Sequence, residues 1–343
     1  MTPLSPYPIP PEWISIKTID MHTGGEPLRV IIGGFPEVTG SGILDYRNFV
    51  KTNYDHLRKA LMWEPRGHAD MYGALLVPSQ IADFGVIFMH NEGYSTMCGH
   101  ATIALAKLAV EAKWIKASEP ETRMTLEAPC GLIEAFAQVK GGQVISSRFT
   151  NVPSFVVALN EYLNIPGIGK VKYDIAYGGA FYAFVKAREL GLRCIPEYYQ
   201  ELIQKGKAIK QAIIDTRGHP HHPSQEDLSF LYGTIFIDES DADGVHSRNV
   251  CVFADGELDR SPTGSGVSAR LAIHHAREEV AVEESVTIES ILGTAFTCKI
   301  VDTTTYQGYH SVIPSVEGTA FVTATNEFLI DPNDPLKEGF FLR

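Results

Sequence analysis

The sequence contains an internal repeat, and this repeat constrains the fold more than any other feature. Four short strings recur in the same order at offsets of 154 to 165 residues. The pairs are Asp20–Gly25 with Asp174–Gly179, Met71–Ala74 with Leu231–Thr234, Cys98-Gly99 with Thr263-Gly264, and Thr125–Ala128 with Thr287–Ser290. A single match of this kind could arise by chance, but four in register predict a chain built from two similar halves.

The length and composition fit two domains. With 343 residues, 44% of them hydrophobic, the chain is long enough for two halves that each bury a core. Short runs rich in Val, Ile and aromatic residues, from Ile14–Met21 to Phe321–Ala324, predict strands. Helices are predicted at Asp45–Leu61, Ala101–Ala112, Glu197–Gln211 and Val267–Glu279. This mixture indicates an α+β or mixed α/β class, with the halves meeting near Val152-Pro153.

Charge and cysteine content argue against several classes of protein. A net charge of −12 disfavours nucleic acid and anionic membrane as partners, because both require a basic surface. No segment approaches the roughly 20 apolar residues of a membrane span, and residues 1–11 lack the apolar core of a secretory signal. The histidines His219, His221 and His222 could suggest a metal site, but the proline and glycine residues around them predict a surface loop instead. The cysteines lack paired spacing, so we expect reduced thiols and a cytoplasmic location; they are Cys98, Cys130, Cys194, Cys251 and Cys298.

Cys98 and Thr263 occupy matching positions, each just before a predicted helix. The segment Ala101–Ala112 is apolar nearly all round, so its helix should be buried within a domain. A thiol at the start of that helix is favoured as a thiolate by the macrodipole and the free N–H groups, although most free cysteines are simply buried. If the halves face each other, the two helix N-termini form one site for a carboxylate. Deprotonation of the adjacent carbon would build negative charge that the same donors stabilise.

Long strings along the chain resemble the proline racemase family over nearly its whole length. They are Asp20–Pro27, Glu64–His68 with Asp70–Ala74, Gly93-Tyr94 with Met97–His100, and Asp259–Pro262. The resemblance implies an α+β fold of diaminopimelate-epimerase type, with two pseudo-symmetric domains that each wrap a mixed β-sheet around a central helix. It also implies an active site between the domains and no cofactor. We expect a first domain at residues 12–151, completed by the C-terminal strand 319–343, and a second domain at 152–318.

One position departs from the racemase pattern. Racemases of this family carry a catalytic cysteine in both halves, whereas Thr263 replaces the second thiol here. A threonine hydroxyl is too weak an acid to act as the second acid/base without an activating partner. The Cys98/Thr263 pair resembles the branch of the family that dehydrates trans-3-hydroxy-L-proline to Δ1-pyrroline-2-carboxylate. This resemblance implies Cys98 as the base, with Thr263 as the second catalytic position.

The resemblance also implies the residues that bind the substrate. They are Tyr72, Gly99, His100, Phe253, Asp259, Gly264 and Ser265. Backbone donors at the helix starts would hold the carboxylate, and Asp259 with His100 would receive the ring amine. Tyr72 and Phe253 would wall the ring, unless they are ordinary core aromatics. Asp259 could instead cap the following helix, and Thr263 could cap that helix, bind the substrate or fill the space of the missing thiol.

The stereochemistry of this substrate fits a site with one catalytic face. In trans-3-hydroxy-L-proline the 3-hydroxyl and the α-hydrogen lie on the same face of the ring, so loss of water is a syn elimination. Cys98 could both remove the proton and assist the departing hydroxyl, or His100 or a water could protonate it. The nearest alternative is a proline or 4-hydroxyproline racemase or epimerase. A non-catalytic binding protein, which would not need Cys98, is another, and the family leads us to expect a homodimer.

Overall fold

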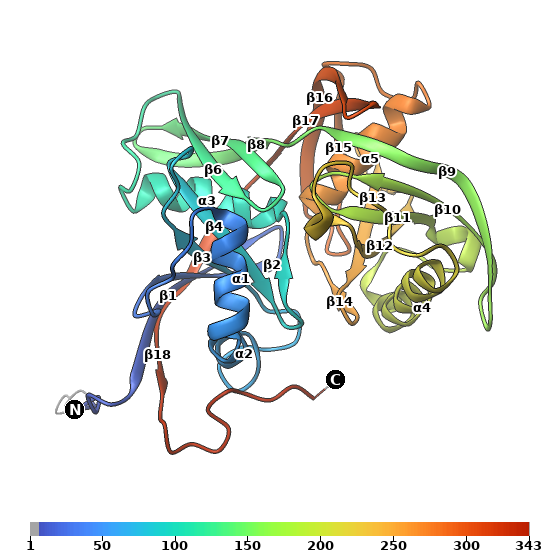
Figure 1. Cartoon of the computed structure of the whole chain (residues 1–343). Coiled ribbons are helices and arrows are strands. Elements are labelled where there is room, and N and C mark those ends of the chain that lie inside the picture. Colours follow the sequence, from blue (N-terminus) through green and yellow to red (C-terminus); the bar gives the residue numbers. More distant parts are fainter. Residues whose placement is uncertain (1–6, 343) are drawn as a thin grey trace.

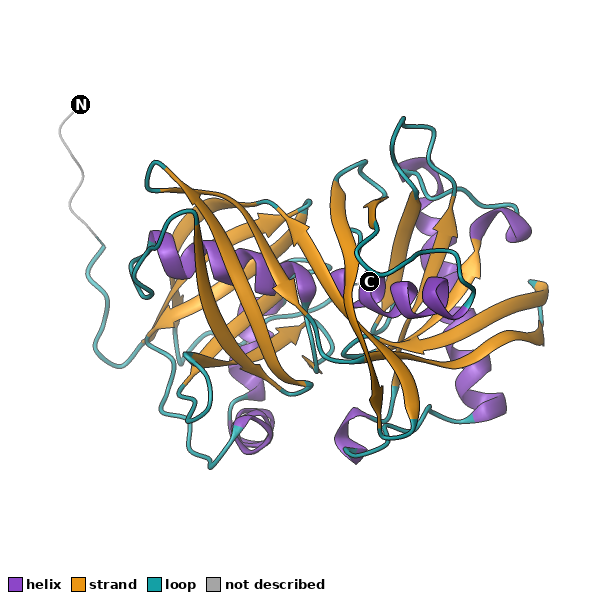
Figure 2. Ribbon diagram, turned by 90° about the horizontal axis from the view of Figure 1, so that it is seen from above, coloured by secondary structure: helices purple, strands orange, loops and turns teal. Residues whose placement is uncertain are grey.

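The computed structural model describes residues 7–342 and shows two lobes side by side (Figure 1). In each lobe the strands surround one central helix (Figure 2). The central helix is α3 (Gly99–Glu111) in the first lobe and α5 (Gly264–Ala276) in the second. Both helices are buried along most of their length, as the apolar sequence of the first one predicts.

The remaining elements form the two sheets and their outer layers. The strands of the first lobe are β1 (Ile14–Thr23), β2 (Glu26–Gly33), β3 (Tyr72–Val77), β4 (Phe84–His90), β5 (Tyr94–Ser95), β6 (Glu121–Ala128), β7 (Gly131–Lys140), β8 (Gln143–Thr150) and β18 (Ala320–Ile330). Those of the second are β9 (Ser154–Ile165), β10 (Gly169–Tyr177), β11 (Phe181–Lys186), β12 (Leu231–Asp238), β13 (Ser247–Phe253), β14 (Glu257–Leu258), β15 (Ser285–Glu289), β16 (Ala295–Tyr306) and β17 (Tyr309–Gly318). The outer helices are α1 (Ile43–Asn53), α2 (Asp55–Met62) and α4 (Tyr199–Arg217), with short 3-10 turns η1 (Ala187–Leu190), η2 (Pro196–Tyr198) and η3 (Glu226–Leu228).

The two lobes share one strand connectivity. In the first, β2 pairs parallel with β3, β3 antiparallel with β4, and β4 parallel with β6. In the second, β11, β12, β13 and β15 repeat this pattern in the same order. The internal repeat of the sequence is therefore a repeat of structure, and the expected α+β fold of two pseudo-symmetric domains is confirmed.

The C-terminal strand lies in the first lobe. β18 pairs antiparallel with β1 from Ile14 to Thr23, just as β9 pairs with β10 in the second lobe. β17 also pairs with β8 and β9, which joins the two sheets. On these pairings we propose that residues 12–151 and 319–343 form the first domain and residues 152–318 the second.

Several elements differ from the sequence predictions. The helix expected at Asp45–Leu61 is two helices, because the backbone at Tyr54 leaves the helical region between α1 and α2. Both central helices begin earlier than expected, at Gly99 and Gly264. Glycine disfavours helix interiors but is tolerated at a helix start, so composition alone places these starts too late. Seven strands were not predicted, namely β5, β7, β8, β9, β11, β14 and β17.

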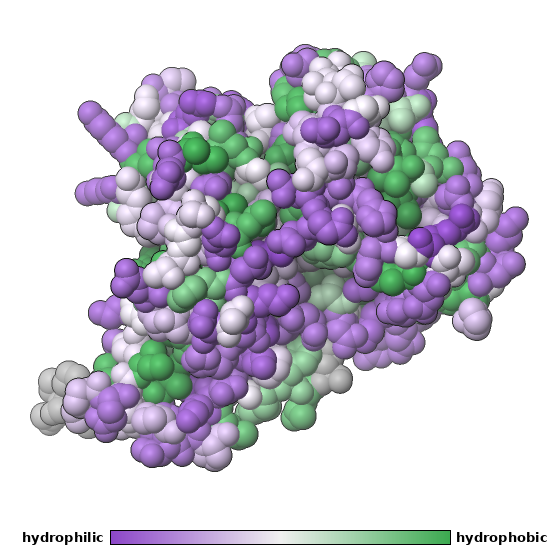
Figure 3. All heavy atoms as spheres, in the orientation of Figure 1, coloured by the Kyte–Doolittle hydropathy of each residue, from purple (hydrophilic) through white to green (hydrophobic). Residues whose placement is uncertain are grey.

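The surface of the protein is mainly hydrophilic on the face that is drawn. On the face shown in Figure 3, hydrophilic residues cover most of the surface and hydrophobic ones form smaller groups between them. Among residues 7–342, no helix is long and apolar enough to cross a membrane. Within the same residues, no cluster of three or more His, Cys, Asp or Glu side chains is arranged to hold a metal ion. All five cysteines are free thiols.

Each domain has a glycine turn that packs against the other domain. Gly25 and Gly179 follow β1 and β10, and both have φ of 95°, which favours glycine over any other residue. A Cβ on Gly25 would lie 2.6 Å from the Leu292 side chain, and one on Gly179 would lie 2.7 Å from Met97. Each contact crosses to the opposite domain. These turns therefore fix how the two halves face each other.

The N-terminal ends of α3 and α5 meet at two glycines. A Cβ on Gly99 would lie 2.6 Å from Gly264 Cα, and a Cβ on Gly264 would lie 2.8 Å from Gly99 Cα. The Phe149 ring packs against both residues. Because the obstructing atoms are backbone, neither glycine can be replaced without moving a helix.

The contact between the helix ends predicts the effect of a single methyl group. Gly264→Ala should destabilise the protein by about 1 to 3 kcal/mol through overpacking, although alanine is the better helix former. The measurement is the midpoint of urea unfolding. Gly93→Ala is the matched control, because a Cβ at Gly93 meets nothing within 4 Å. Equal midpoints for the two variants would contradict the close contact.

Candidate active site

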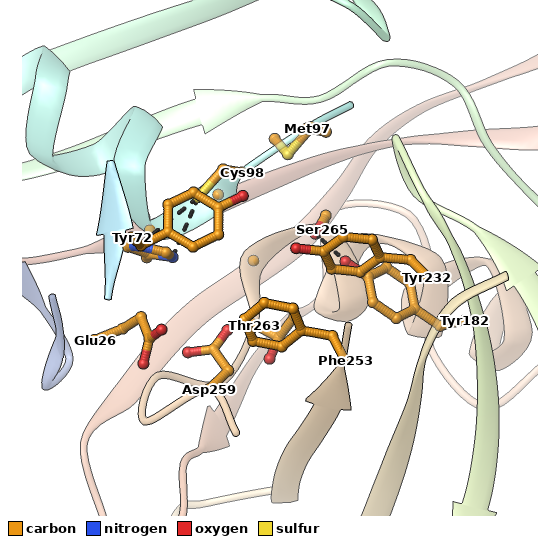
Figure 4. A pocket seen from close by; sticks show the side chains of 13 residues that line it. Glu26, Tyr72, Met97, Cys98, Tyr182, Tyr232, Phe253, Asp259, Thr263 and Ser265 are labelled. Carbon is orange, nitrogen blue, oxygen red and sulfur yellow. Dashed lines mark hydrogen bonds between the residues drawn. The ribbon is translucent and has the colours of Figure 1, made fainter. Parts of the chain in front are cut away.

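The cavity at the meeting point of α3 and α5 is the candidate functional site. Including its open mouth, its volume is about 290 Å3. Figure 4 shows side chains of both domains facing this space. The lining residues are Glu26, Tyr72, Met97, Cys98, Gly99, His100, Tyr182, Tyr232, Phe253, Asp259, Thr263, Gly264 and Ser265. Every site residue expected from the sequence lies in this wall. Glu26, Met97, Tyr182 and Tyr232 were not expected.

Cys98 immediately precedes α3 and is held against His100. The Cys98 side chain is buried, and its Sγ lies 3.2 Å from His100 Nδ1. His100 Nε2 lies 3.2 Å from the carbonyl oxygen of Pro27. A carbonyl only accepts, so this contact assigns the ring proton to Nε2 and leaves Nδ1 as an acceptor facing the thiol. Burial lowers the pKa of His100 to about 3, so the imidazole is neutral at physiological pH.

Burial favours the protonated thiol of Cys98 over the thiolate. Burial raises its pKa well above the ordinary value, while the N–H of Ala101 and the hydroxyl of Tyr72 act in the opposite direction. The sequence-based expectation that the helix start favours a thiolate is therefore wrong for this state. Desolvation of the charged form outweighs the helix donors here. A bound cation would shift the balance back towards the thiolate.

Two buried carboxyl groups, Glu26 from the first domain and Asp259 from the second, lie near each other in the cavity (Figure 4). Asp259 accepts a hydrogen bond of 2.7 Å from the backbone N–H of Ser261, and burial raises its pKa to about 6. Glu26 Oε2 accepts one of 2.7 Å from the N–H of Arg260. Glu26 Oε1 is buried and has no hydrogen-bond partner among residues 7–342. Burial, followed by the charge of Asp259, raises the pKa of Glu26 well above its usual range.

Glu26 was not among the site residues expected from the sequence, although it lies in the string Asp20–Pro27. It follows the Gly24-Gly25 turn and is the first residue of β2. Glutamate is almost never fully buried unless it is paired or functional, and Glu26 is 0% exposed. Nothing in the sequence around it marks that burial, so only the fold identifies it.

Thr263 precedes α5 in a conformation that β-branched residues rarely adopt. Its φ is 66° and its ψ is 88°, a strained region for such a side chain that is typical of functional sites. The Thr263 side chain makes no capping hydrogen bond to α5, which removes the capping alternative. Its hydroxyl makes no hydrogen bond of good geometry within residues 7–342, although it lies close enough to lower the pKa of Asp259. Asp259 does not cap α5 either, because Thr263 holds that position.

Aromatic side chains close the rest of the cavity. The rings of Tyr232 and Phe253 stack with centroids 5.2 Å apart, and Tyr72 meets Phe253 edge-on at 6.4 Å. Both tyrosine hydroxyls contact Ser95. Tyr72 donates to Ser95 Oγ at 2.5 Å, and the Tyr232 hydroxyl lies 2.7 Å from the same oxygen. The hydroxyl of Tyr182 lies 2.7 Å from Ser265 Oγ. The wall is thus apolar in its body and polar at defined points.

The groups around the cavity differ in the charge that they can bind. No lysine or arginine is among the lining residues. The first N–H groups of α3 and α5 have no partner within their own helices, so both helix ends can donate to an anion. Asp259 and Glu26 supply the only carboxyl groups in the lining. A ligand with a carboxylate at one end and an amine at the other matches this arrangement.

Known proteins resemble this chain over nearly its full length. A family model described as proline racemase matches residues 18–341. The trans-3-hydroxy-L-proline dehydratase of Colwellia psychrerythraea is 51% identical over 333 residues, which cover 96% of this chain and 94% of that protein. The trans-3-hydroxy-L-proline dehydratase of Homo sapiens is 44% identical over 336 residues, 96% and 95% of the two chains.

The fold of a solved structure agrees with these similarities. A hydroxyproline epimerase from Agrobacterium vitis, with bound trans-4-hydroxy-L-proline, has a TM-score of 0.91 and 34% identity. The match covers 96% of this chain and 96% of that one. With its two repeated domains and a cleft at the paired helix starts, the chain belongs to the proline racemase family.

Proposed function

We propose that this protein dehydrates trans-3-hydroxy-L-proline to Δ1-pyrroline-2-carboxylate without a cofactor. The observation that carries the proposal is the unequal pair at the two helix starts, with a thiol at Cys98 and a hydroxyl at Thr263, both lining one cavity. One side of the cavity has a group that can take an α-proton. The relatives that bear the name of this dehydratase support the assignment.

The substrate fits with its carboxylate at the helix starts and its ring between the aromatic side chains. The N–H groups of Gly99, His100, Gly264 and Ser265 then hold the carboxylate. Asp259 accepts from the ring ammonium in a charge-assisted hydrogen bond. Glu26 Oε1 faces the same part of the cavity. Both nitrogens of His100 are already engaged, by Cys98 and by Pro27, so we assign His100 to holding the thiol and not the amine.

The reaction is a syn elimination on the Cys98 side. The ring ammonium brings a positive charge into the cavity, which lowers the pKa of the thiol. The thiolate removes the α-proton, and the electron pair of the C–H bond forms the double bond as the 3-hydroxyl leaves. Charge that develops on the carboxylate is stabilised by the helix N–H groups. The enamine product then tautomerises to the imine.

A racemase or epimerase is the second candidate. The hydroxyproline epimerase that shares this fold is the observation in its favour. Inversion at the α-carbon requires a proton donor on the opposite side of the ring from Cys98. Thr263 occupies that side, and a threonine hydroxyl is a poor acid. The proposed dehydratase needs no group there.

The proposed function is tested by proton NMR of the protein with trans-3-hydroxy-L-proline, and separately with L-proline, in D2O. We expect the hydroxyproline signals to give way to those of pyrroline-2-carboxylate, and no D-proline to form. Cys98→Ser should abolish the conversion while the protein still binds the substrate. Deuterium at the α-carbon of proline together with accumulating D-proline would instead establish a racemase. Conversion by Cys98→Ser at the rate of the unaltered protein would rule out the thiol as the base.

A single substitution should add a second catalytic face. Thr263→Cys places a thiol opposite Cys98 and should create measurable racemisation of L-proline, because each side then has an acid/base group. The measurement is α-deuterium incorporation with formation of D-proline. Thr263→Ser is the control, since it keeps a hydroxyl and should not racemise. A Thr263→Cys protein that binds proline but never inverts it would contradict the two-sided cavity.

The pKa of Asp259 predicts the acid limb of activity. With a pKa of about 6, this carboxyl group is neutral below pH 6 and cannot pair with the ring ammonium. The value of kcat/KM should therefore rise with pH up to about pH 6 as Asp259 ionises, and a further rise at higher pH should follow the ionisation of the Cys98 thiol. Asp259→Asn should raise the activation free energy that kcat/KM reports by about 2 to 3 kcal/mol. It should also remove the rise of activity near pH 6. An unchanged acid limb in Asp259→Asn would assign it to another group.

A further inference from the structure

Glu26 brings a carboxyl group into the cavity that the reaction assigned above does not use. Its side chain is 0% exposed and points into the cavity (Figure 4). Oε2 accepts a hydrogen bond of 2.7 Å from the backbone N–H of Arg260, which fixes the orientation of the group. Oε1 is buried and has no hydrogen-bond partner among residues 7–342. A buried polar atom without a partner is costly, so Oε1 points to a ligand in the cavity.

The surroundings of Glu26 favour its neutral form. Burial, followed by the charge of Asp259, raises the pKa of Glu26 well above its usual range. The guanidinium of Arg260 pairs with Asp70 at 2.6 Å, whereas the backbone N–H of Arg260 binds Glu26. A neutral carboxyl group has one O–H donor. Because Oε2 accepts a hydrogen bond, that hydrogen lies on Oε1 and can be given to a ligand.

Glu26 and Cys98 belong to the same side of the cavity. Both come from the first domain, where Glu26 begins β2 and Cys98 precedes α3. The carbonyl oxygen of Pro27, the next residue, lies 3.2 Å from His100 Nε2, and His100 Nδ1 lies 3.2 Å from Cys98 Sγ. One imidazole ring therefore joins the backbone beside Glu26 to the catalytic thiol.

The stereochemistry of the substrate makes this side the important one. The α-hydrogen and the 3-hydroxyl of trans-3-hydroxy-L-proline lie on one face of the ring. A ring that presents its α-hydrogen to Cys98 therefore also turns its 3-hydroxyl towards the first domain. Hydroxide is a poor leaving group, so an acid on this side would speed its departure.

The first domain lines the cavity with four side chains that carry a hydrogen on oxygen, nitrogen or sulfur, namely Glu26, Tyr72, Cys98 and His100. The Tyr72 hydroxyl donates to Ser95 Oγ at 2.5 Å. The ring N–H of His100 is held by a backbone carbonyl, and Cys98 serves as the base. Glu26 is the remaining donor, and a carboxylic acid is also the strongest acid of the four types.

From this arrangement we propose that Glu26 is the general acid of the dehydration and protonates the departing 3-hydroxyl from Oε1. The inference rests on the proposed dehydratase function. Asp259 keeps its role as the partner of the ring ammonium, because it is ionised above about pH 6. The α-carbon of the substrate carries both the ring nitrogen and C3. Two carboxyl groups that lie near each other can therefore serve these two neighbouring atoms.

The step balances without any other reactant. The Cys98 thiolate takes the α-proton, the electron pair of that C–H bond forms the double bond to C3, and the C3–O bond breaks. Glu26 gives its proton to the departing oxygen, which leaves as water. The step ends with Cys98 as a thiol and Glu26 as a carboxylate. Transfer of one proton from the thiol to the carboxylate restores both groups.

The charges of the two groups are suited to this exchange. Burial is the main cause of the raised pKa of Cys98, and the charges of Asp259 and Glu26 add to it. A neutral Glu26 therefore leaves the thiol easier to ionise than a charged Glu26 would. The protonation state that makes Glu26 an acid is thus also the one that favours the thiolate.

The test compares two leaving groups in one variant of the full-length protein. Glu26→Gln keeps the size of the side chain, and its amide oxygen can still accept from the N–H of Arg260, but an amide is not an acid. Formation of product from trans-3-hydroxy-L-proline, followed by proton NMR, should fall about 100-fold. Chloride leaves without a proton. The same variant should therefore convert trans-3-chloro-L-proline within a few-fold of the rate of the unaltered protein.

Glu257→Gln is the matched control. Glu257 is also buried, has an oxygen without a hydrogen-bond partner among residues 7–342, and lies 3.3 Å from His90. It is not among the residues that line the cavity, so the same substitution there should leave both rates within a few-fold. L-Proline, which lacks the 3-hydroxyl, tests binding alone. Its affinity for Glu26→Gln, measured by isothermal titration calorimetry, should stay within a few-fold.

Three results would overturn the assignment of Glu26. Dehydration by Glu26→Gln at the rate of the unaltered protein would show that another group protonates the hydroxyl. Equal losses with the hydroxy and chloro substrates, together with weaker binding of L-proline, would instead make Glu26 a partner of the ammonium. The same selective loss in Glu257→Gln would show that the effect is not specific to the cavity. If the unaltered protein forms no pyrroline-2-carboxylate, the proposed function itself fails.

Discussion

The contact between Gly99 and Gly264 sets the geometry of the whole cavity. Each helix brings the positive end of its macrodipole and a set of free N–H groups to its first residue. Two such ends in backbone contact repel each other electrostatically unless an anion lies between them. The sheets hold them together through the pairing of β17 with β8 and β9 and through the glycine turns that cross between the domains. The fold thus brings together two helix ends that can both donate to one anion, and in the proposed function this anion is the substrate carboxylate.

Burial shifts the pKa values of the acidic groups in the cavity. Cys98, Glu26 and Asp259 all have raised pKa values, and burial is the largest cause for each. Burial therefore favours the neutral forms of Cys98 and Glu26, whereas Asp259 is ionised above about pH 6. A substrate with a ring ammonium changes the charge state of the cavity when it binds. In the proposed reaction, recognition of the amine is thereby coupled to the reactivity of the thiol, which would not happen with a surface cysteine at the same helix start.

Much of this could be predicted from the sequence, for a physical reason. Turns, helix starts and catalytic strings recur in register, and these local patterns place Cys98 and Thr263 at equivalent points of two domains. The prediction of two similar halves follows from that equivalence, whereas the type of α+β fold and most residues expected in the cavity came from the resemblance to the proline racemase family. Burial does not leave a comparable local signal. Glu26, Ser95 and Tyr232 are brought to the site by β2, β5 and β12, and they contact neighbours more than 100 residues away in the chain. The direction of the Cys98 pKa shift was missed for the same reason.

The return of β18 to pair with β1 has a consequence for how the chain folds during synthesis. The strands β9 to β17 are contiguous in sequence, so the second lobe can assemble as soon as they have left the ribosome. The sheet of the first lobe is different, because its strand β1 keeps one edge open until residues up to Ile330 are made. An unpaired strand edge invites association with other chains. The half that is translated first is therefore the half that is finished last, and it carries the exposed edge throughout elongation.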